Sequence, residues 1–232
     1  ENVVVLKPDF AEAHNNLGVA LKEIGQYDDA VRSYEKAVAI RKDYAEAHNN
    51  HGNALKELGK LDESIKSYKK ALDINPNYPA FHNNLGNALK ELGQLSNAIK
   101  CYQDAITIDL ADADSYNNLG VAFFEIGQHD QALDSYEKAL SINPEYVEAH
   151  NNLGTVFNKL GKLDAAVESY ETALSIEPNY ADAYNNFGVV LKKLGRLDES
   201  IASYQKALSI DPSNADTHNN LGNALAELEY LE

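Results

Sequence analysis

The feature that most constrains this chain is a 34-residue period that runs through all 232 residues. The segment Ala-Glu-Ala-His-Asn-Asn-Leu-Gly at residues 11–18 returns in related form at residues 45, 79, 113, 147, 181 and 215, with no insertion or deletion between copies. We number positions within a repeat from 1 at each of these starts. Because one short repeat cannot bury its apolar face alone, the period predicts repeats stabilised by stacking.

The period also sets the expected domain organisation. No segment departs from it, so we expect a single array over residues 1–232. This array contains a half-repeat at 1–10, six full repeats at 11–44, 45–78, 79–112, 113–146, 147–180 and 181–214, and a partial repeat at 215–232.

Each repeat predicts two helices. In the first helix, positions 4, 7, 8, 11 and 14 form an apolar stripe at helical spacing, as in Leu17 and Leu21. The second helix is expected to pack through positions 20, 24, 27 and 28, as in Ala30 and Tyr34. Glycine at position 8 and small residues at positions 20 and 27 allow close approach of the backbones, and Tyr at position 24 fills the remaining space.

The breaks between the helices have their own residues. Position 15 is Gly in every full repeat, which suits the left-handed residue that ends a helix. An acidic residue such as Asp28 is expected to cap the second helix. Pro recurs at position 32 and ends that helix, while Lys42 and Leu110 replace it in two repeats.

These residues together resemble the tetratricopeptide repeat: Leu-Gly-x-x-Leu followed by Gly, Ala, Tyr, Ala and Pro at fixed offsets. The form His/Tyr-Asn-Asn-Leu-Gly-x-x-Leu is most similar to the repeat region of O-GlcNAc transferase and Spindly-type proteins. The resemblance implies an all-α fold, a right-handed superhelix of antiparallel helix pairs whose first helices line a concave groove. It also implies a groove in which asparagines hold peptide backbones.

The candidate binding residues are asparagines at positions 5 and 6 of all seven copies. Asparagine is a mediocre helix former, so folding alone gives no reason for two of them in mid-helix. A helical wheel turns positions 2, 5, 6, 9, 12 and 13 away from the packing stripe and towards the groove. The candidates are Asn15, Asn16, Asn49, Asn50, Asn83, Asn84, Asn117, Asn118, Asn151, Asn152, Asn185, Asn186, Asn219 and Asn220.

Three interpretations of these asparagines stay open at this point. A carboxamide donates and accepts at once, which matches the backbone of an extended peptide. Alternatively, one asparagine of each pair bonds to the neighbouring repeat and fixes the stacking. A third possibility is a solvated polar face that binds nothing.

The net charge limits the classes of binding partner that we expect. The chain has 20 Lys and Arg against 36 Asp and Glu, a formal net charge of −16, which disfavours nucleic acid and anionic membranes as partners. Positions 2, 12 and 13 of the groove also sum to a negative charge, with no basic clamp for a terminal carboxylate. We therefore expect a protein or an extended peptide, neutral to mildly basic. No apolar run is long enough to span a membrane and no signal peptide is present, so a cytoplasmic location is expected.

Catalysis and cofactors are not expected. Histidine at position 4 alternates with Tyr, which favours packing, and His48 with His51 lacks a third metal-ligating neighbour in sequence. Cys101 occupies a slot that is Ser in the other repeats and is expected to be a small buried residue. With no phosphate loop or nucleophile motif, we expect no enzymatic activity, no cofactor and no metal.

The ends suggest two further functions. Val3–Leu6 belong to a half-repeat that lacks its first helix. Leu221, Leu225, Leu228 and Leu231 lie on a helix that lacks its partner helix. Two uncovered apolar ends predict head-to-tail self-association. The absent initial Met favours instead a fragment of a longer array, and the targeting region of a glycosyltransferase is the third functional alternative.

Overall fold

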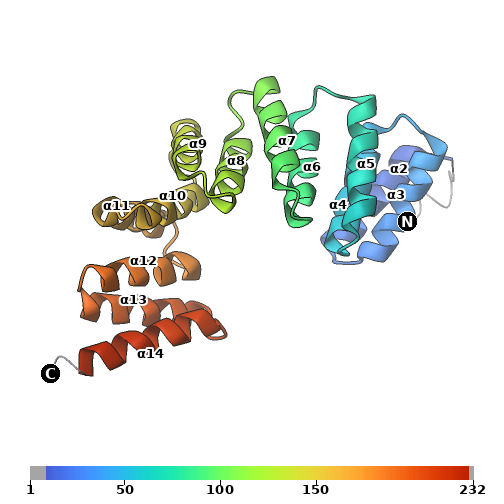
Figure 1. Ribbon diagram of the computed structural model, residues 1–232. Coiled ribbons are helices and arrows are strands. Elements are labelled where there is room, and N and C mark those ends of the chain that lie inside the picture. The colour runs from blue at the N-terminus through green and yellow to red at the C-terminus, as the bar shows by residue number, and fades with distance from the viewer. Residues whose placement is uncertain (1–8, 230–232) are drawn as a thin grey trace. The chain divides into compact units, whose positions relative to one another are not determined.

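The computed structural model describes residues 9–229 of the chain, which form thirteen α-helices and no strand. Each full repeat contains a first and a second helix, as the sequence predicted (Figure 1). The first helices cover positions 1–13 and are α2 (Ala11–Glu23), α4 (Ala45–Glu57), α6 (Pro79–Glu91), α8 (Ala113–Glu125), α10 (Val147–Lys159) and α12 (Ala181–Lys193), followed by the longer α14 (Ala215–Glu229). The second helices cover positions 17–30 and are α3 (Tyr27–Ile40), α5 (Leu61–Ile74), α7 (Leu95–Ile108), α9 (His129–Ile142), α11 (Leu163–Ile176) and α13 (Leu197–Ile210).

Two compact units make up the chain, Glu1–Ala122 and Phe123–Glu232, and the division falls inside α8. Within the first unit, α2 packs on α3, α4 on α5 and α6 on α7, and α3 also packs on α4 and α5 on α6. Within the second unit, α10 packs on α11 and α12 on α13, and α13 packs on α14. Most of the half-repeat predicted at 1–10, including Val3–Leu6, and Leu231 of the leucine row lie outside the described residues.

The turn inside each repeat is built on the predicted glycine. Gly25, Gly59, Gly93, Gly127, Gly161 and Gly195 all have φ between 70° and 78°, the left-handed region. Gly25 N–H donates to the Lys22 carbonyl at 3.0 Å and Gln26 N–H to the Leu21 carbonyl at 2.9 Å, so the last carbonyls of α2 have partners. This prediction is confirmed.

The expectation that Asp28 caps the second helix is wrong. The helix begins after Gln26, whose side chain makes no capping hydrogen bond, and Asp28 lies within the first turn. Its carboxylate there still faces the positive end of the helix dipole, so it stabilises the helix through charge rather than through a cap.

The closest contact within a repeat joins Gly at position 8 to Tyr at position 24. A Cβ added to Gly18, Gly52, Gly86, Gly154 or Gly188 would lie 2.6–2.8 Å from the nearest ring carbon of that tyrosine. Real Cβ atoms do not approach so closely, so only glycine permits this spacing of the two helices. The predicted role of the small residues is therefore confirmed.

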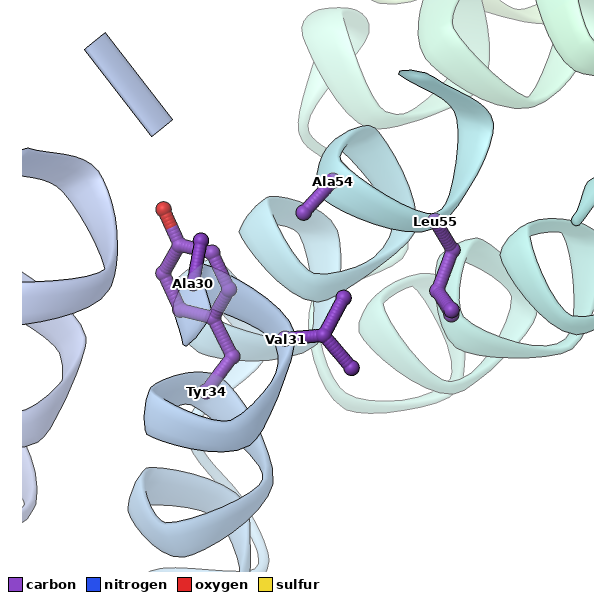
Figure 2. Close-up of a cluster of buried hydrophobic side chains, with 5 residues drawn as sticks. All are labelled: Ala30, Val31, Tyr34, Ala54 and Leu55. Atoms are coloured by element: carbon purple, nitrogen blue, oxygen red, sulfur yellow. The ribbon is translucent and has the colours of Figure 1, made fainter. Parts of the chain in front are cut away.

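The same tyrosine also joins each repeat to the next. Figure 2 shows Tyr34 and Val31 of α3 in one buried cluster with Ala54 and Leu55 of α4. In the second unit, Tyr204 of α13 forms a corresponding cluster with Ala224 of α14. Position 10, which supplies Ala54 and Ala224, was not among the predicted packing positions, and neither was position 3, where Ala47 is fully buried.

We predict opposite effects of one substitution at two equivalent glycines. Gly86→Ala places a methyl group 2.6 Å from the Tyr102 ring and should lower the free energy of unfolding by about 1–3 kcal/mol. Gly222, at the same position of α14, has no atom within 4 Å of an added Cβ, so Gly222→Ala should raise it by about 0.5–1 kcal/mol. Urea unfolding of both variants measures the difference; two changes of the same sign would contradict the packing account.

Candidate peptide-binding groove

The two asparagine rows are hydrogen-bonded to each other between successive repeats. In five pairs the asparagine at position 6 donates its Nδ2–H to the Oδ1 of position 5 in the preceding repeat. The pairs of the first unit are Asn50 to Asn15 at 3.1 Å, Asn84 to Asn49 at 2.9 Å and Asn118 to Asn83 at 2.9 Å. The pairs of the second unit are Asn186 to Asn151 at 3.2 Å and Asn220 to Asn185 at 3.0 Å.

The two asparagine rows differ in how far they are buried, although both positions are Asn in all seven copies. Four position-5 side chains, those of Asn15, Asn49, Asn117 and Asn151, are only 6–8% exposed. Asn83 and Asn185 are half-buried, and Asn219 of α14 is exposed. The position-6 row is more open: Asn50, Asn84, Asn118, Asn152, Asn186 and Asn220 are half-buried and Asn16 is exposed. The interpretation in which one asparagine of each pair bonds to the neighbouring repeat is therefore confirmed for these five pairs.

The bond between the rows uses only part of the carboxamide at position 6. A carboxamide has two N–H donors and an oxygen with two lone pairs. In Asn84, for example, the inter-repeat bond takes one N–H and leaves the other N–H and the Oδ1 for a second partner. One donor and one acceptor is also what a peptide unit requires.

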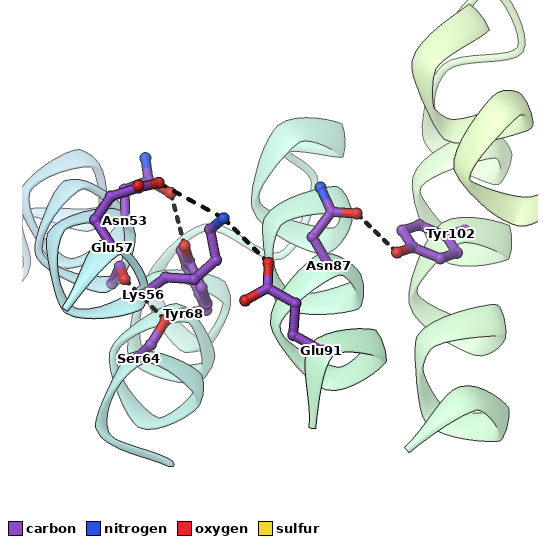
Figure 3. A network of polar contacts seen from close by, with 9 residues as sticks. Asn53, Lys56, Glu57, Ser64, Tyr68, Asn87, Glu91 and Tyr102 are labelled. Carbon is purple, nitrogen blue, oxygen red and sulfur yellow. Dashed lines mark hydrogen bonds and ion pairs between the residues drawn. The ribbon is translucent and has the colours of Figure 1, made fainter. Parts of the chain in front are cut away.

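A second set of contacts with the same 35-residue offset lies at positions 12 and 13. Lys56 Nζ reaches Glu91 Oε1 at 3.2 Å (Figure 3), and Lys192 Nζ reaches Glu227 Oε2 at 3.2 Å. Lys193 Nζ donates to Asn158 Oδ1 at 2.6 Å, with the basic residue now on the later repeat. These exposed pairs add little stability, so they matter chiefly as the charge pattern of the surface.

The side chain at position 9 forms a hydrogen bond with the buried tyrosine at position 24 in three repeats. Tyr68 donates its hydroxyl hydrogen to Asn53 Oδ1 at 2.7 Å, and Tyr102 donates to Asn87 Oδ1 at the same distance (Figure 3). Burial raises the pKa of Tyr170 to about 12, and its hydroxyl pairs with Thr155 at 3.1 Å. The Tyr170 hydroxyl therefore stays protonated at pH 7, and all three tyrosine hydroxyls form structural hydrogen bonds with position 9.

A cavity of about 410 Å³ shows which positions share the groove surface in the second unit. It is lined by Val189, Lys192 and Lys193 of α12, Tyr204 of α13, and Asn220 and Glu227 of α14. These are positions 9, 12, 13, 24, 6 and 13 of their repeats. Positions 6, 9, 12 and 13 thus lie on one hollowed face, as the helical wheel indicated.

A larger cavity, of about 510 Å³, lies elsewhere in the first unit. It is lined by residues of α3, α5 and the turn between α3 and α4, with His48 of α4. Its lining contains none of the asparagines of the two rows, and its charged residues are of both signs. It is therefore separate from the groove.

Histidine at position 4 holds the turn between repeats. Nε2 of His48, His82, His150 and His218 lies 2.8–3.1 Å from the carbonyl oxygen of the residue six places earlier, at position 32 of the preceding repeat. That residue is Lys42 in the first case and Pro in the other three. The histidine therefore satisfies a turn carbonyl. Among the described residues, no group of three His, Cys, Asp or Glu is placed to hold a metal ion.

Burial disfavours the charged forms of His51 and Cys101. Burial, with His48 and Lys70 nearby, lowers the pKa of His51 to about 4, so the ring is neutral at pH 7. Its Nδ1 lies 3.1 Å from Ser67 Oγ, while its Nε2 is buried with no hydrogen-bond partner in the described part of the chain. Burial also raises the pKa of the Cys101 thiol to about 11, which disfavours the thiolate needed of a nucleophile. Cys101 is half-buried, slightly more open than the serines at its position.

Helix pairs joined by a left-handed glycine and stacked at a constant register define an α-solenoid of helix–turn–helix repeats. Comparison with known families identifies which one. The TPR repeat model matches residues 20–59, 52–93, 86–127, 122–161, 154–195 and 188–228, so the chain belongs to the tetratricopeptide repeat family. Members of this family generally act as non-catalytic scaffolds that bind proteins or peptides.

Solved structures agree with this assignment. A chain of the APC/C hetero-tetramer Cut9–Hcn1 is similar with a TM-score of 0.84 and 21% identity over 97% of this chain, which spans only 44% of that chain. MamA is 31% identical, with a TM-score of 0.62 over 69% of this chain and 94% of its own. YrrB, described as a TPR protein with an unusual peptide-binding site, is 22% identical, with a TM-score of 0.61 over 80% of this chain and 96% of its own. No curated protein matches the chain in sequence, and no helix in the described residues is long and apolar enough to cross a membrane.

We predict that His51 makes stability pH-dependent. Its pKa is lowered from 6.5 to about 4 on folding, so between these values the unfolded chain binds more protons and stability falls as pH falls. Between pH 7 and pH 5 the loss from this residue should be on the order of 2 kcal/mol. His51→Leu restores the residue that most other repeats have at this position. Between pH 7 and pH 5 its free energy of unfolding should fall by about 2 kcal/mol less than that of the unaltered protein. Urea unfolding of both proteins at the two pH values is the measurement, and equal losses would contradict the burial of a neutral ring.

Proposed function

We propose that this protein is a non-catalytic scaffold that binds an extended peptide segment of a partner protein in its asparagine-lined groove. The observation that carries the proposal is the position-6 row. The carboxamides of Asn50, Asn84 and Asn186, for example, are half-buried and bonded to the position-5 row, and the inter-repeat bond leaves each of them a second N–H and an oxygen. A ligand meets side chains that are already oriented, which lowers the entropy lost on binding.

The spacing supports an extended ligand. Packed helices lie about 8–10 Å apart, and an extended chain advances about 3.3 Å per residue, so successive asparagines meet about every third peptide unit. Contacts to the backbone give affinity with little demand on sequence, while position 9, which varies between Val, Asn and Thr, contributes selectivity.

Two other findings support the class of ligand. The similar structure YrrB has a peptide-binding site by its description. The groove of the first unit carries Glu57 and Glu91 around Lys56, a local excess of negative charge. Charge complementarity there favours a neutral to mildly basic segment.

Self-association is a second candidate, favoured by Leu225, which is 41% exposed on α14. Light scattering over a wide concentration range separates the two functions, since self-association requires a mass that rises with concentration. The motif similarity to O-GlcNAc transferase and Spindly keeps the targeting region of a glycosyltransferase as a third. A sugar-nucleotide domain in the same open reading frame would support it.

We predict that the two asparagine rows respond differently to removal. The triple variants N50A/N84A/N118A and N15A/N49A/N83A delete the same three inter-repeat hydrogen bonds. The free energy of unfolding of each variant should fall by about 1–3 kcal/mol for each hydrogen bond removed. Only the position-6 variant should also lose peptide affinity, by at least about tenfold, because its carboxamides are more open than the buried side chains of Asn15 and Asn49.

The probe is a linear peptide selected from a random display library on the unaltered chain, measured by fluorescence anisotropy well below the melting temperature of both variants. The position-5 triple variant is the control for the lost inter-repeat bonds. Equal loss of affinity in both variants would assign the effect to stacking and would overturn direct binding by position 6.

A further inference from the structure

The cavity in the groove of the second unit has the composition of a side-chain pocket. Val189 is half-buried and lies with the buried Tyr204 in its lining, so part of the wall is apolar. Asn220 of the position-6 row stands in the same lining. A peptide whose backbone is held at Asn220 therefore has a cavity beside it for a side chain with an aliphatic stem.

The polar part of this lining has one cation in excess. Lys192 is paired with Glu227 at 3.2 Å, which balances one positive charge. Lys193 donates to the neutral Oδ1 of Asn158 at 2.6 Å and has no ion pair among the described residues. An unbalanced ammonium group at the edge of a partly apolar cavity favours an anionic group.

The equivalent place in the first unit has the opposite balance. There position 13 is Glu57 in place of Lys193, and Lys56 lies 3.6 Å from Glu57 and 3.2 Å from Glu91. One lysine thus faces two glutamates. Position 9 is Asn53 in place of Val189, and its Oδ1 accepts the Tyr68 hydroxyl hydrogen. The same register therefore carries different chemistry in the two units.

We infer that the second unit selects an acidic side chain, glutamate or aspartate, at one fixed place in the bound peptide. The inference rests on the proposed peptide-binding function and adds the chemistry of one subsite. The carboxylate meets Lys193, the methylene groups contact Val189 and Tyr204, and the backbone meets Asn220. The ligand is then neutral to basic where it faces the first unit's glutamates and acidic where it faces this cavity.

The test selects linear peptides from a random twelve-residue display library on the whole chain and reads the charge at each aligned place. An enriched peptide is then synthesised with its acidic residue and with the corresponding amide. Both forms are measured against the unaltered protein, K193Q and K193R. K193Q keeps a donor for Asn158 and removes the charge, while K193R keeps the charge. K206Q, at an exposed lysine of α13 outside the cavity lining, is the matched control.

We expect the amide form of the peptide to bind three- to tenfold more weakly than the acid to the unaltered protein, to K193R and to K206Q. With K193Q the two forms should bind alike. Peptides that bind without a fixed acidic residue, or an acid preference that persists in K193Q, would overturn the subsite and leave the peptide-binding function standing. Failure to recover any binding peptide would overturn both.

Discussion

The fold depends on the contact between glycine at position 8 and tyrosine at position 24. The ring of Tyr34 rests against Gly18 of its own repeat and is buried beside Ala54 of the next. One aromatic side chain thus sets the distance between two helices of a repeat and between that repeat and its neighbour. Since overpacking in such a contact costs about 1–3 kcal/mol, the spacing of the repeats is strongly specified.

A fixed spacing has a consequence for the groove. Within each unit the first helices of successive repeats stack in one register, so position 5 of one repeat meets position 6 of the next in the five pairs described above. The asparagine bonds and the Lys56–Glu91 pair share the same 35-residue offset for this reason. The core therefore orients the carboxamides of the position-6 row, while positions 9, 12 and 13 are free to vary in charge and size. Under the proposed function, this division gives each unit a row of backbone-binding side chains together with local selectivity.

Much of the fold could be predicted from the sequence because the period is strict. The helix pairs, the left-handed glycines such as Gly25, and the small residues around Tyr34 follow from spacing and steric limits alone. The separation of the asparagine rows could not be predicted. Positions 5 and 6 are adjacent on a helical wheel, and only the placement of the neighbouring repeat decides that Asn49 is covered while Asn84 stays half-open. The bond from His48 to the Lys42 carbonyl was missed because it crosses a turn, where helical periodicity gives no information.

The central claim is that position 6 binds the ligand and position 5 holds the repeats. The most direct test is the ¹⁵N NMR spectrum of the labelled chain, with backbone and side-chain amides both recorded, during titration with a selected peptide. The account predicts that the Nδ2 resonances of Asn50, Asn84 and Asn186 shift to saturation with the binding curve, while those of Asn15 and Asn49 shift little. Shifts confined to the second helices, around the cavity at Val38 and Ile74, would contradict it and place the binding surface outside the groove.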